Sequence, residues 1–162
     1  SVPYNNGGVF GSVQRISGPQ TIGATETVAC SYTNTAGTSI PQTTATFIGY
    51  PTKIFDTHNA YSSSTGYTCP ISGIYSVSAY YTCTSTSLGT YNLEIRKNSV
   101  IIHRSEISRV ANVGSAFCPS ITQLVQCVAG DIIQTYAYSN LAGQSMTTTS
   151  GTNQLSINRV GI

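Results

Sequence analysis

Residues 55–81 read FDTHNAYSSSTGYTCPISGIYSVSAYY, and this stretch decides the predicted fold. From Gly73 to Thr84 the residues alternate with a period of two, which is typical of a β-strand whose two faces differ. One face is continuous core, and the other is a mixed surface that meets water or another subunit. The first holds Tyr75, Val77, Ala79, Tyr81 and Cys83, and the second holds Ile74, Ser76, Ser78, Tyr80 and Thr82.

The residues before this strand predict two shorter strands and a turn. Lys53 to Phe55 form a short strand, the loop DTHNAYSSSTG follows, and Gly66 to Cys69 form another strand. The segment PISG then reverses the chain, because Gly73 permits the close turn that follows Pro70. The stretch therefore predicts three strands in succession.

Strand signals continue on both sides of this stretch. The further segments are 25–33 and 40–51 before it, and 90–96, 100–103, 121–128, 132–138 and 154–162 after it. We expect tight turns at Lys97–Asn98 and at 129–131, a loop or irregular strand over 108–120, and a loop over 139–153. Since no segment has helical periodicity longer than two turns, these roughly eight to ten strands predict an all-β sandwich or jelly roll.

The composition is consistent with one small β domain. Only 7% of the 162 residues are charged, which is too few to cover the solvent faces of several helices. The net charge of +2 comes from scattered basic residues and argues against nucleic-acid binding. No apolar run approaches the ~20 residues of a transmembrane helix. Residues 1–24 are rich in Gly, Asn, Ser and Pro and predict an extended N-terminal arm or a disordered tail, with the jelly-roll domain at 25–162.

The five cysteines do not form a recognisable framework. Their number is odd and no pair has a C-x-x-C spacing, which argues against both a disulfide scaffold and a zinc site. We interpret them as buried thiols that act as small apolar residues. The chain also has no N-x-[ST] sequon, which disfavours a eukaryotic secreted glycoprotein.

Residues 55–81 resemble the signature of the complement C1q globular-head family. That family has a short strand, a loop, a Gly-aromatic strand, a Pro-x-Ser-Gly turn and an aromatic-rich strand. Downstream, LVQCVAGDIIQTY (124–136) is similar to its paired strands joined at a Gly-Asp turn, and LSINRVGI (155–162) to its last strand. The matching residues are Phe55, Gly66, Tyr67, Pro70, Gly73, Tyr75, Gly130, Asp131 and Ile133.

The resemblance spans roughly residues 25–162 and has structural implications. It implies a ten-stranded jelly roll related to tumour necrosis factor, assembled as a tight homotrimer around a three-fold axis. Ile74 and Tyr80 agree with a trimer, because a monomer would leave the strand face that carries them exposed to solvent. Cys69 and Cys127 occupy positions usually filled by Ala and Leu, which supports buried thiols. Secreted animal members usually follow a collagen stem, whereas this chain has no Gly-X-Y run.

Two groups of polar residues are candidates for a catalytic role. Asp56 and His58 could share one face of a strand, but a nucleophile would have to come from elsewhere, so we favour a structural loop motif. His103, Arg104 and Glu106 form a second cluster, which we interpret as a solvated strand edge. Neither group predicts catalysis.

Metal and cofactor sites are likewise not predicted. Asp56 and Asp131 could contribute to an axial calcium site, but five carboxylates in total without an acidic cluster disfavour one. We therefore assign no catalytic, cofactor-binding or metal-binding residue.

The functional expectation is a non-enzymatic virion structural protein. We expect a trimeric bacteriophage capsid decoration protein on the virion surface, whose arm (1–24) contacts the major capsid protein. The alternative is the receptor- or glycan-binding tip of a phage fibre, or a secreted recognition module, with a Tyr/Asn/Gln-rich apex. The eleven tyrosines fit a recognition surface and ordinary sheet packing equally well.

Overall fold

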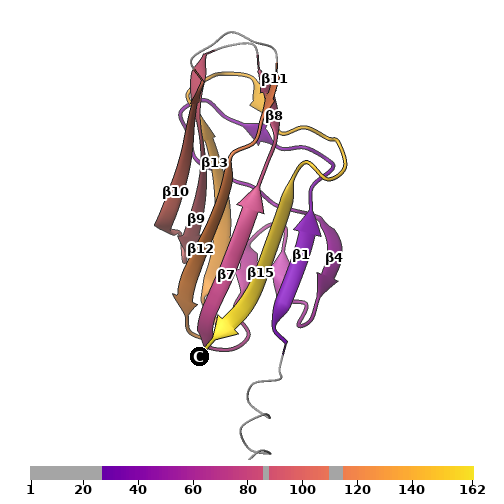
Figure 1. Cartoon of the computed structure of the whole chain (residues 1–162), viewed down its shortest axis with the longest axis vertical. Helices are drawn as coiled ribbons and strands as arrows, with labels where there is room; N and C mark the ends of the chain where they lie inside the picture. Colours follow the sequence, from indigo (N-terminus) through magenta and orange to yellow (C-terminus); the bar gives the residue numbers. More distant parts are fainter. Residues whose placement is uncertain (1–26, 86–87, 110–114) are drawn as a thin grey trace, which may run out of the picture.

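The computed structural model describes residues 27–85, 88–109 and 115–162, and every regular element in these ranges is a β-strand. Two antiparallel sheets pack face to face (Figure 1). The five-stranded sheet has the order β12-β7-β15-β1-β4. Its strands are β1 (Ala29–Thr33), β4 (Thr52–Asp56), β7 (Gly73–Tyr80), β12 (Ser120–Cys127) and β15 (Gln154–Gly161).

The six-stranded sheet forms the other layer. Its order is β10-β9-β13-β6-β5, and β3 also pairs with β13. Its strands are β3 (Thr46–Phe47), β5 (Tyr61–Ser62), β6 (Gly66–Thr68), β9 (Gly89–Lys97), β10 (Val100–Arg109) and β13 (Ile132–Ser139). Two smaller sheets pair β2 (Ser39–Ile40) with β14 (Gln144–Ser145), and β8 (Cys83–Ser85) with β11 (Ser115–Phe117).

Neighbouring strands of the five-stranded sheet are distant in sequence. β1 pairs with β15, so that Tyr32 lies opposite Leu155, and β7 runs between β12 and β15. Such long-range antiparallel pairing within a two-layer sandwich is the topology of a jelly roll. The predicted all-β jelly-roll class is confirmed, and the two main sheets hold five and six strands, the sixth being the two-residue β3.

The alternation from Gly73 to Cys83 is confirmed, although it covers two strands. Tyr75, Val77 and Ala79 are buried between the sheets, and their neighbours face outward. The chain leaves the sheet after Tyr80, because the amide of Thr82 donates to the side chain of Asn153 (2.9 Å) instead of to a neighbouring strand. β8 then pairs with β11 in a different sheet, so the predicted strand from Gly73 to Thr84 is divided in two. The longest strand of the described residues is therefore β10.

Other predicted boundaries need correction. The extended segment 40–51 contains β3 as a separate short strand, the loop after Asp56 contains β5, and the loop 139–153 contains β14. The strand predicted at 100–103 continues to Arg109. The sequence did not predict residues 104–109 as part of this strand, because the polar residues His103, Arg104 and Glu106 are typical of the solvent-exposed end of a strand.

The hairpin between β9 and β10 turns one residue later than predicted. Asn98 and Ser99 have φ values of 50° and 69°, so they form the two-residue turn instead of Lys97–Asn98. Positive φ at both turn residues matches the twist of the flanking strands. The register then shifts at a bulge between Ile101 and His103, which places Arg104 opposite Glu94.

Tyrosines fill the interior of the sandwich. Of the ten tyrosines in the described residues, six are buried and none is fully exposed, so the interpretation as sheet packing applies to most of them. Their hydroxyls are mostly hydrogen-bonded, as buried polar groups require. Tyr32 donates to Asp56 Oδ2 (2.9 Å), Tyr75 to the carbonyl of Ile71 (2.5 Å) and Tyr81 to the carbonyl of Asn92 (3.1 Å).

Tyr67 differs, because its buried hydroxyl has no hydrogen-bond partner among the described residues. An unpaired buried hydroxyl costs about 1–3 kcal/mol of stability. We therefore expect Tyr67→Phe to raise the free energy of unfolding by about 1 kcal/mol in urea denaturation. Tyr81→Phe, which removes a bonded hydroxyl, is the control and should lower it. A loss of stability in Tyr67→Phe would contradict an unpaired hydroxyl.

The cysteines follow the predicted buried-thiol pattern with one exception. Cys30, Cys69, Cys83 and Cys127 are buried free thiols, whereas Cys118 is exposed. Burial raises the pKa of the Cys30 thiol to about 12, with a further contribution from the Asp56 carboxylate. Burial likewise raises the pKa of Cys83 to about 12, and Cys118 adds to this effect.

Thiol labelling tests this arrangement directly. The thiolate is the reactive form, so the four buried groups are protected both by their raised pKa and by packing. With a disulfide reagent at neutral pH, we expect one thiol per native chain to react rapidly and the other four to react only on unfolding. Cys118→Ser should abolish the rapid phase, and a second rapid thiol would contradict the packing described here.

The predicted N-terminal arm at 1–24 lies outside the described residues, so it stays a prediction, as does the domain boundary at residue 25. Within the described part of the chain, no helix is long and apolar enough to cross a membrane.

Candidate functional site

The outward face of the six-stranded sheet carries two regular rows of polar side chains. In one row Arg104, Glu94 and Tyr136 lie opposite one another on β10, β9 and β13. In the next row Glu106, Asn92 and Tyr138 repeat this arrangement. The rows lie side by side because residues two apart on a strand share one face.

Glu94 is the centre of the first row. Its side chain is only 1% exposed, and each carboxylate oxygen accepts from one arginine. Arg104 donates to Oε1 through Nε (2.8 Å) and Nη2 (2.6 Å). Arg96 donates to Oε2 through Nε (2.8 Å), and its Nη2 forms an ion pair with the same oxygen at 2.6 Å. Arg96 also lies 3.9 Å above the Tyr136 ring. Each arginine thus places two nitrogens against one oxygen of the carboxylate, and this two-point contact holds both guanidinium groups in fixed planes.

Asn92 links the second row in the same way. The neighbours of its amide determine the orientation, in which NH₂ donates to Glu106 Oε2 and to the carbonyl of Tyr91, each at 3.1 Å. Asn92 is buried, whereas Glu106 is exposed. A buried amide therefore positions an exposed carboxylate.

Apart from Tyr136, the residues of these rows line an open groove with a volume of about 510 Å³, which we call the polar groove. Its two carboxylates, with Arg96 and Arg104, form a cluster of four charges that cancel. The size lies in the range of ligand pockets, roughly 300–1,000 Å³. The residues that line it include Thr90, Asn92, Glu94, Arg104, Glu106 and Tyr138.

The structure confirms that His103, Arg104 and Glu106 lie on a solvated edge strand, and it adds buried partners that the sequence did not show. β10 is an edge strand and His103 is exposed, as expected. Arg104, however, is bound to a buried carboxylate, and Glu106 contacts a buried amide. Sequence reasoning missed Glu94 and Asn92. The alternation of TYNLEIR places both on the face opposite Leu93, but it does not identify their partners.

The five-stranded sheet presents an opposite kind of surface. None of the outward-facing side chains of β12, β7, β15 and β1 is charged. Hydroxyls of Thr122, Ser78, Ser156 and Ser31 form a row across all four strands. Thr122 bonds to Ser78 (3.0 Å), and Ser156 to Ser31 (3.3 Å). We call this surface the uncharged face.

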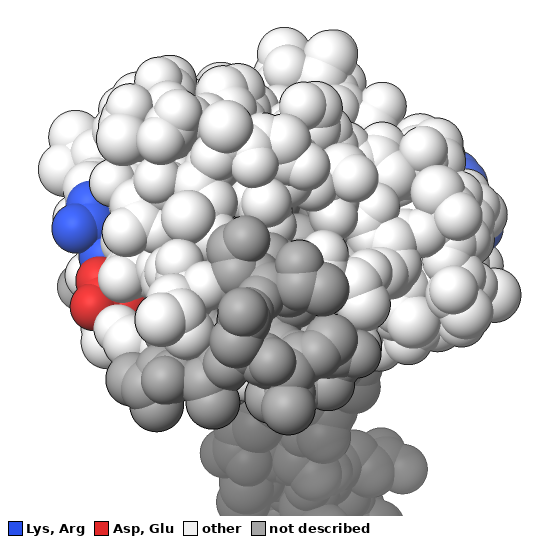
Figure 2. All heavy atoms as spheres, turned by 90° about the horizontal axis from the view of Figure 1, so that it is seen from above, with Lys and Arg blue, Asp and Glu red and all other residues white. Residues whose placement is uncertain are grey.

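A view from above shows one end of the domain. Uncharged residues cover almost all of the visible described surface, and charged residues occupy only its sides (Figure 2). On one side basic and acidic side chains lie next to each other.

Asp56 and His58 form a loop motif, as favoured from the sequence. Asp56 Oδ1 accepts from the backbone amide of His58 (3.1 Å), and Oδ2 accepts from Tyr32 Oη (2.9 Å) and from the amide of Tyr61 (3.0 Å). The His58 imidazole bonds to the Thr57 hydroxyl at 2.8 Å instead. Burial raises the pKa of Asp56, but the hydrogen bonds from Ala60, His58, Tyr61 and Tyr32 outweigh it, and the pKa is lowered.

Asp131 stabilises the Gly-Asp turn. Its Oδ2 accepts from the amide of Val128 (2.9 Å) and its Oδ1 from Asn98 Nδ2 (2.8 Å). The hydrogen bond from Val128, followed by that from Asn98, lowers the pKa of the carboxyl. Gly130, with φ of 96°, provides the left-handed conformation of the turn.

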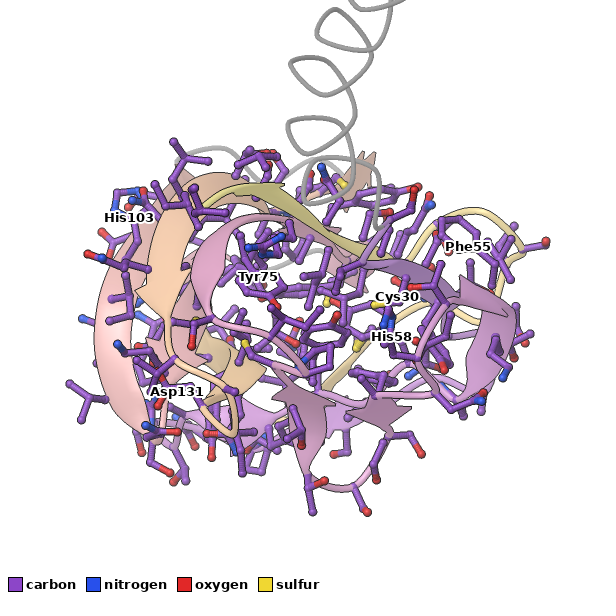
Figure 3. The ribbon with its side chains drawn as sticks, turned by 90° about the horizontal axis from the view of Figure 1, so that it is seen from below. Cys30, Phe55, His58, Tyr75, His103 and Asp131 are labelled. Carbon is purple, nitrogen blue, oxygen red and sulfur yellow. The ribbon has the colours of Figure 1, made fainter. Side chains whose placement is uncertain are left out.

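The remaining candidates are not brought together. Asp131 and His103 lie on one side of the domain, and Phe55 lies on the other (Figure 3). His58 lies well away from both Asp131 and His103. Asp56 and Asp131 therefore do not share a calcium site. Within residues 27–85, 88–109 and 115–162, no group of three His, Cys, Asp or Glu side chains is close enough to hold a metal ion.

Known proteins resemble this chain in fold. No protein-family model and no curated protein matches its sequence. Among solved structures, the globular domain of zebrafish complement 1qA protein superimposes with a TM-score of 0.58 at 15% identity, over 83% of this chain and 97% of the other. Eiger TNF from S. frugiperda superimposes with a TM-score of 0.61 at 6% identity, over 83% and 93%. The chain therefore has the jelly-roll fold of the C1q globular domain and tumour necrosis factor, as the sequence resemblance implies.

Proposed function

We propose that this chain is a non-catalytic binding module that assembles as a homotrimer and decorates the surface of a virion. Its partner there is a major capsid protein. The jelly-roll fold supports the binding module, and the resemblance of residues 55–81 to the C1q family supports the trimer.

The uncharged face is the observation that best supports assembly of the chain into a trimer. Covering a charged group is costly, whereas these hydroxyls already bond to each other in pairs across the strands. Protein interfaces are depleted in charge at their centres, as this face is. Leu124 on β12 and Phe55 on β4 are 58% and 49% exposed at opposite edges of the same sheet. A second copy that covers this face would bury them without leaving a charge unpaired.

Sedimentation of the purified protein tests the assembly. We expect a trimer for the native chain, and a monomer for Ser78→Arg, which places a charge at the centre of the hydroxyl row. Ser64→Arg is the control, because Ser64 is exposed in the loop between β5 and β6, and it should remain trimeric. A native monomer, or a trimer that survives Ser78→Arg, would overturn the proposed interface.

The virion role needs a separate experiment. Virus particles from cultures that carry the gene are purified on a density gradient and analysed by mass spectrometry. We expect the protein to co-purify with the particles in a constant ratio to the capsid protein. Protein that is abundant in the lysate but absent from the particles would contradict decoration.

A receptor- or glycan-binding module is the second candidate, and the polar groove favours it. A protein that serves only to cover a lattice has no need of polar side chains held in fixed planes by buried partners. The two candidates are compatible with the same trimer.

A further inference from the structure

We propose that the polar groove on the outward face of β9, β10 and β13 binds a neutral saccharide. This proposal rests on the binding role proposed above and assigns a ligand class to one site. It also places the site on the sheet opposite the uncharged face, so that assembly through that face would leave the groove open.

The charge of the groove excludes ionic ligands as its best partners. Arg96 and Arg104 are both neutralised by Glu94, and Glu106 brings the cluster of four charges to zero. A strongly anionic ligand would be repelled by Glu106, and a cation would compete with guanidinium groups already in place. The groove is therefore suited to a ligand that carries no net charge.

The lining also disfavours an apolar ligand. Besides Ala45 and Tyr138, the side chains of the groove are hydroxyls, amides, carboxylates and a guanidinium group. An apolar ligand would remove these groups from water without replacing their hydrogen bonds, which is unfavourable. A ligand rich in hydroxyl groups would replace those bonds.

Arg104 and Glu106 offer complementary hydrogen-bonding capacity side by side. Arg104 uses Nε and Nη2 to bind Glu94, and its side chain remains 48% exposed, so other N–H groups face the groove. Glu106 uses Oε2 to accept from Asn92, and its carboxylate retains acceptor sites. A hydroxyl both donates and accepts, so two adjacent sugar hydroxyls can bridge a fixed carboxylate and a fixed guanidinium group.

Tyr138 supplies the apolar component that a sugar ring requires. The Tyr136 ring is already covered by Arg96, whereas Tyr138 is half-buried and lines the groove beside Asn92. A tyrosine ring packs against the C–H face of a pyranose and leaves its hydroxyl at the rim for water or ligand. Thr90 and Asn140 add a hydroxyl and an amide at the same end.

The preorganisation of these groups is the strongest argument. Glu94 and Asn92 are buried and orient the exposed side chains of Arg104 and Glu106. A site whose groups are fixed before binding loses less conformational entropy on association. An ordinary exposed ion pair has no such buried support and is mobile.

The test is a titration of the ¹⁵N-labelled full chain with glucose, galactose, mannose and N-acetylglucosamine, followed by NMR. We expect millimolar binding of at least one sugar, with chemical-shift changes concentrated at 90–94, 104–106 and 138. Sialic acid, which is anionic, should bind more weakly. Glu106→Gln and Tyr138→Ala should each weaken binding by about tenfold.

The controls separate binding from folding. Glu106 is exposed, so Glu106→Gln should fold normally even if Tyr138→Ala does not. His103→Ala, on the same strand but outside the groove, should leave binding unchanged. The absence of shifts with every neutral sugar, shifts located elsewhere, or a preference for sialic acid would each overturn the proposal. Sedimentation of the same sample reports the oligomeric state independently, so failure here is distinguishable from failure of the trimer.

Discussion

Gly66→Ala should destabilise the domain by about 3–5 kcal/mol. Two effects combine at this residue. Gly66 has φ of +112°, a conformation that L-residues rarely adopt, and an added Cβ would lie 2.5 Å from the carbonyl oxygen of Ile133. That oxygen belongs to the central strand β13, which pairs with β6 and β9 and cannot move without disturbing both.

Gly143→Ala is the matched control for this prediction. Gly143 also has a positive φ (+68°), but nothing lies within 4 Å of the added Cβ. The control therefore measures the backbone penalty alone, about 1–2 kcal/mol. Urea denaturation of both variants separates strain from collision. Equal losses in the two variants would show that β13 moves aside easily and would contradict the close approach.

Glu94→Gln should cost about 3 kcal/mol of stability, because it leaves two arginines without their shared carboxylate. We expect the lower end of the range for broken buried ion pairs, since the side chains of Arg96 and Arg104 are 18% and 48% exposed and can regain water. The loss should persist at high salt, because screening hardly reaches a carboxylate that is 1% exposed.

Glu106→Gln provides the comparison, since it removes the exposed carboxylate of the same cluster. Its effect on the free energy of unfolding should stay within about 0.5 kcal/mol. Thermal melts of both variants with and without salt test the difference. If Glu94→Gln proves as mild as Glu106→Gln, the arginines find other partners and the rows are not preorganised.

The strand that decides the fold could be predicted because its sequence and its environment agree. Tyr75, Val77 and Ala79 alternate with small polar residues, and β7 is an interior strand that has core on one side only. Short strands such as β3, β5 and β14 could not be predicted, because two residues carry no periodicity. Their pairing comes from the strands that they meet.

The polar groove could not be predicted because it depends on register. A regular hairpin with Lys97 opposite Val100 would place His103 opposite Glu94. The bulge between Ile101 and His103 inserts one residue and places Arg104 there instead. A one-residue shift exchanges the faces of all the residues that follow, so Arg104 and Glu106 both reach the outward side. Nothing in the local sequence distinguishes the two registers.

The pairing of β1 with β15 has a consequence for how the domain can be mounted. Ala29 lies opposite Asn158, and the amide of Arg159 donates to the carbonyl of Val28 (2.8 Å), so the described chain enters and leaves at the same pole (Figure 1). A tag, stalk or carrier joined directly before residue 27 or after Ile162 would emerge from that one pole, and the turns at the other pole would point away from it. Fusions at these two positions should therefore display the domain in the same orientation, and a short linker between residues 27 and 162 should leave both sheets intact.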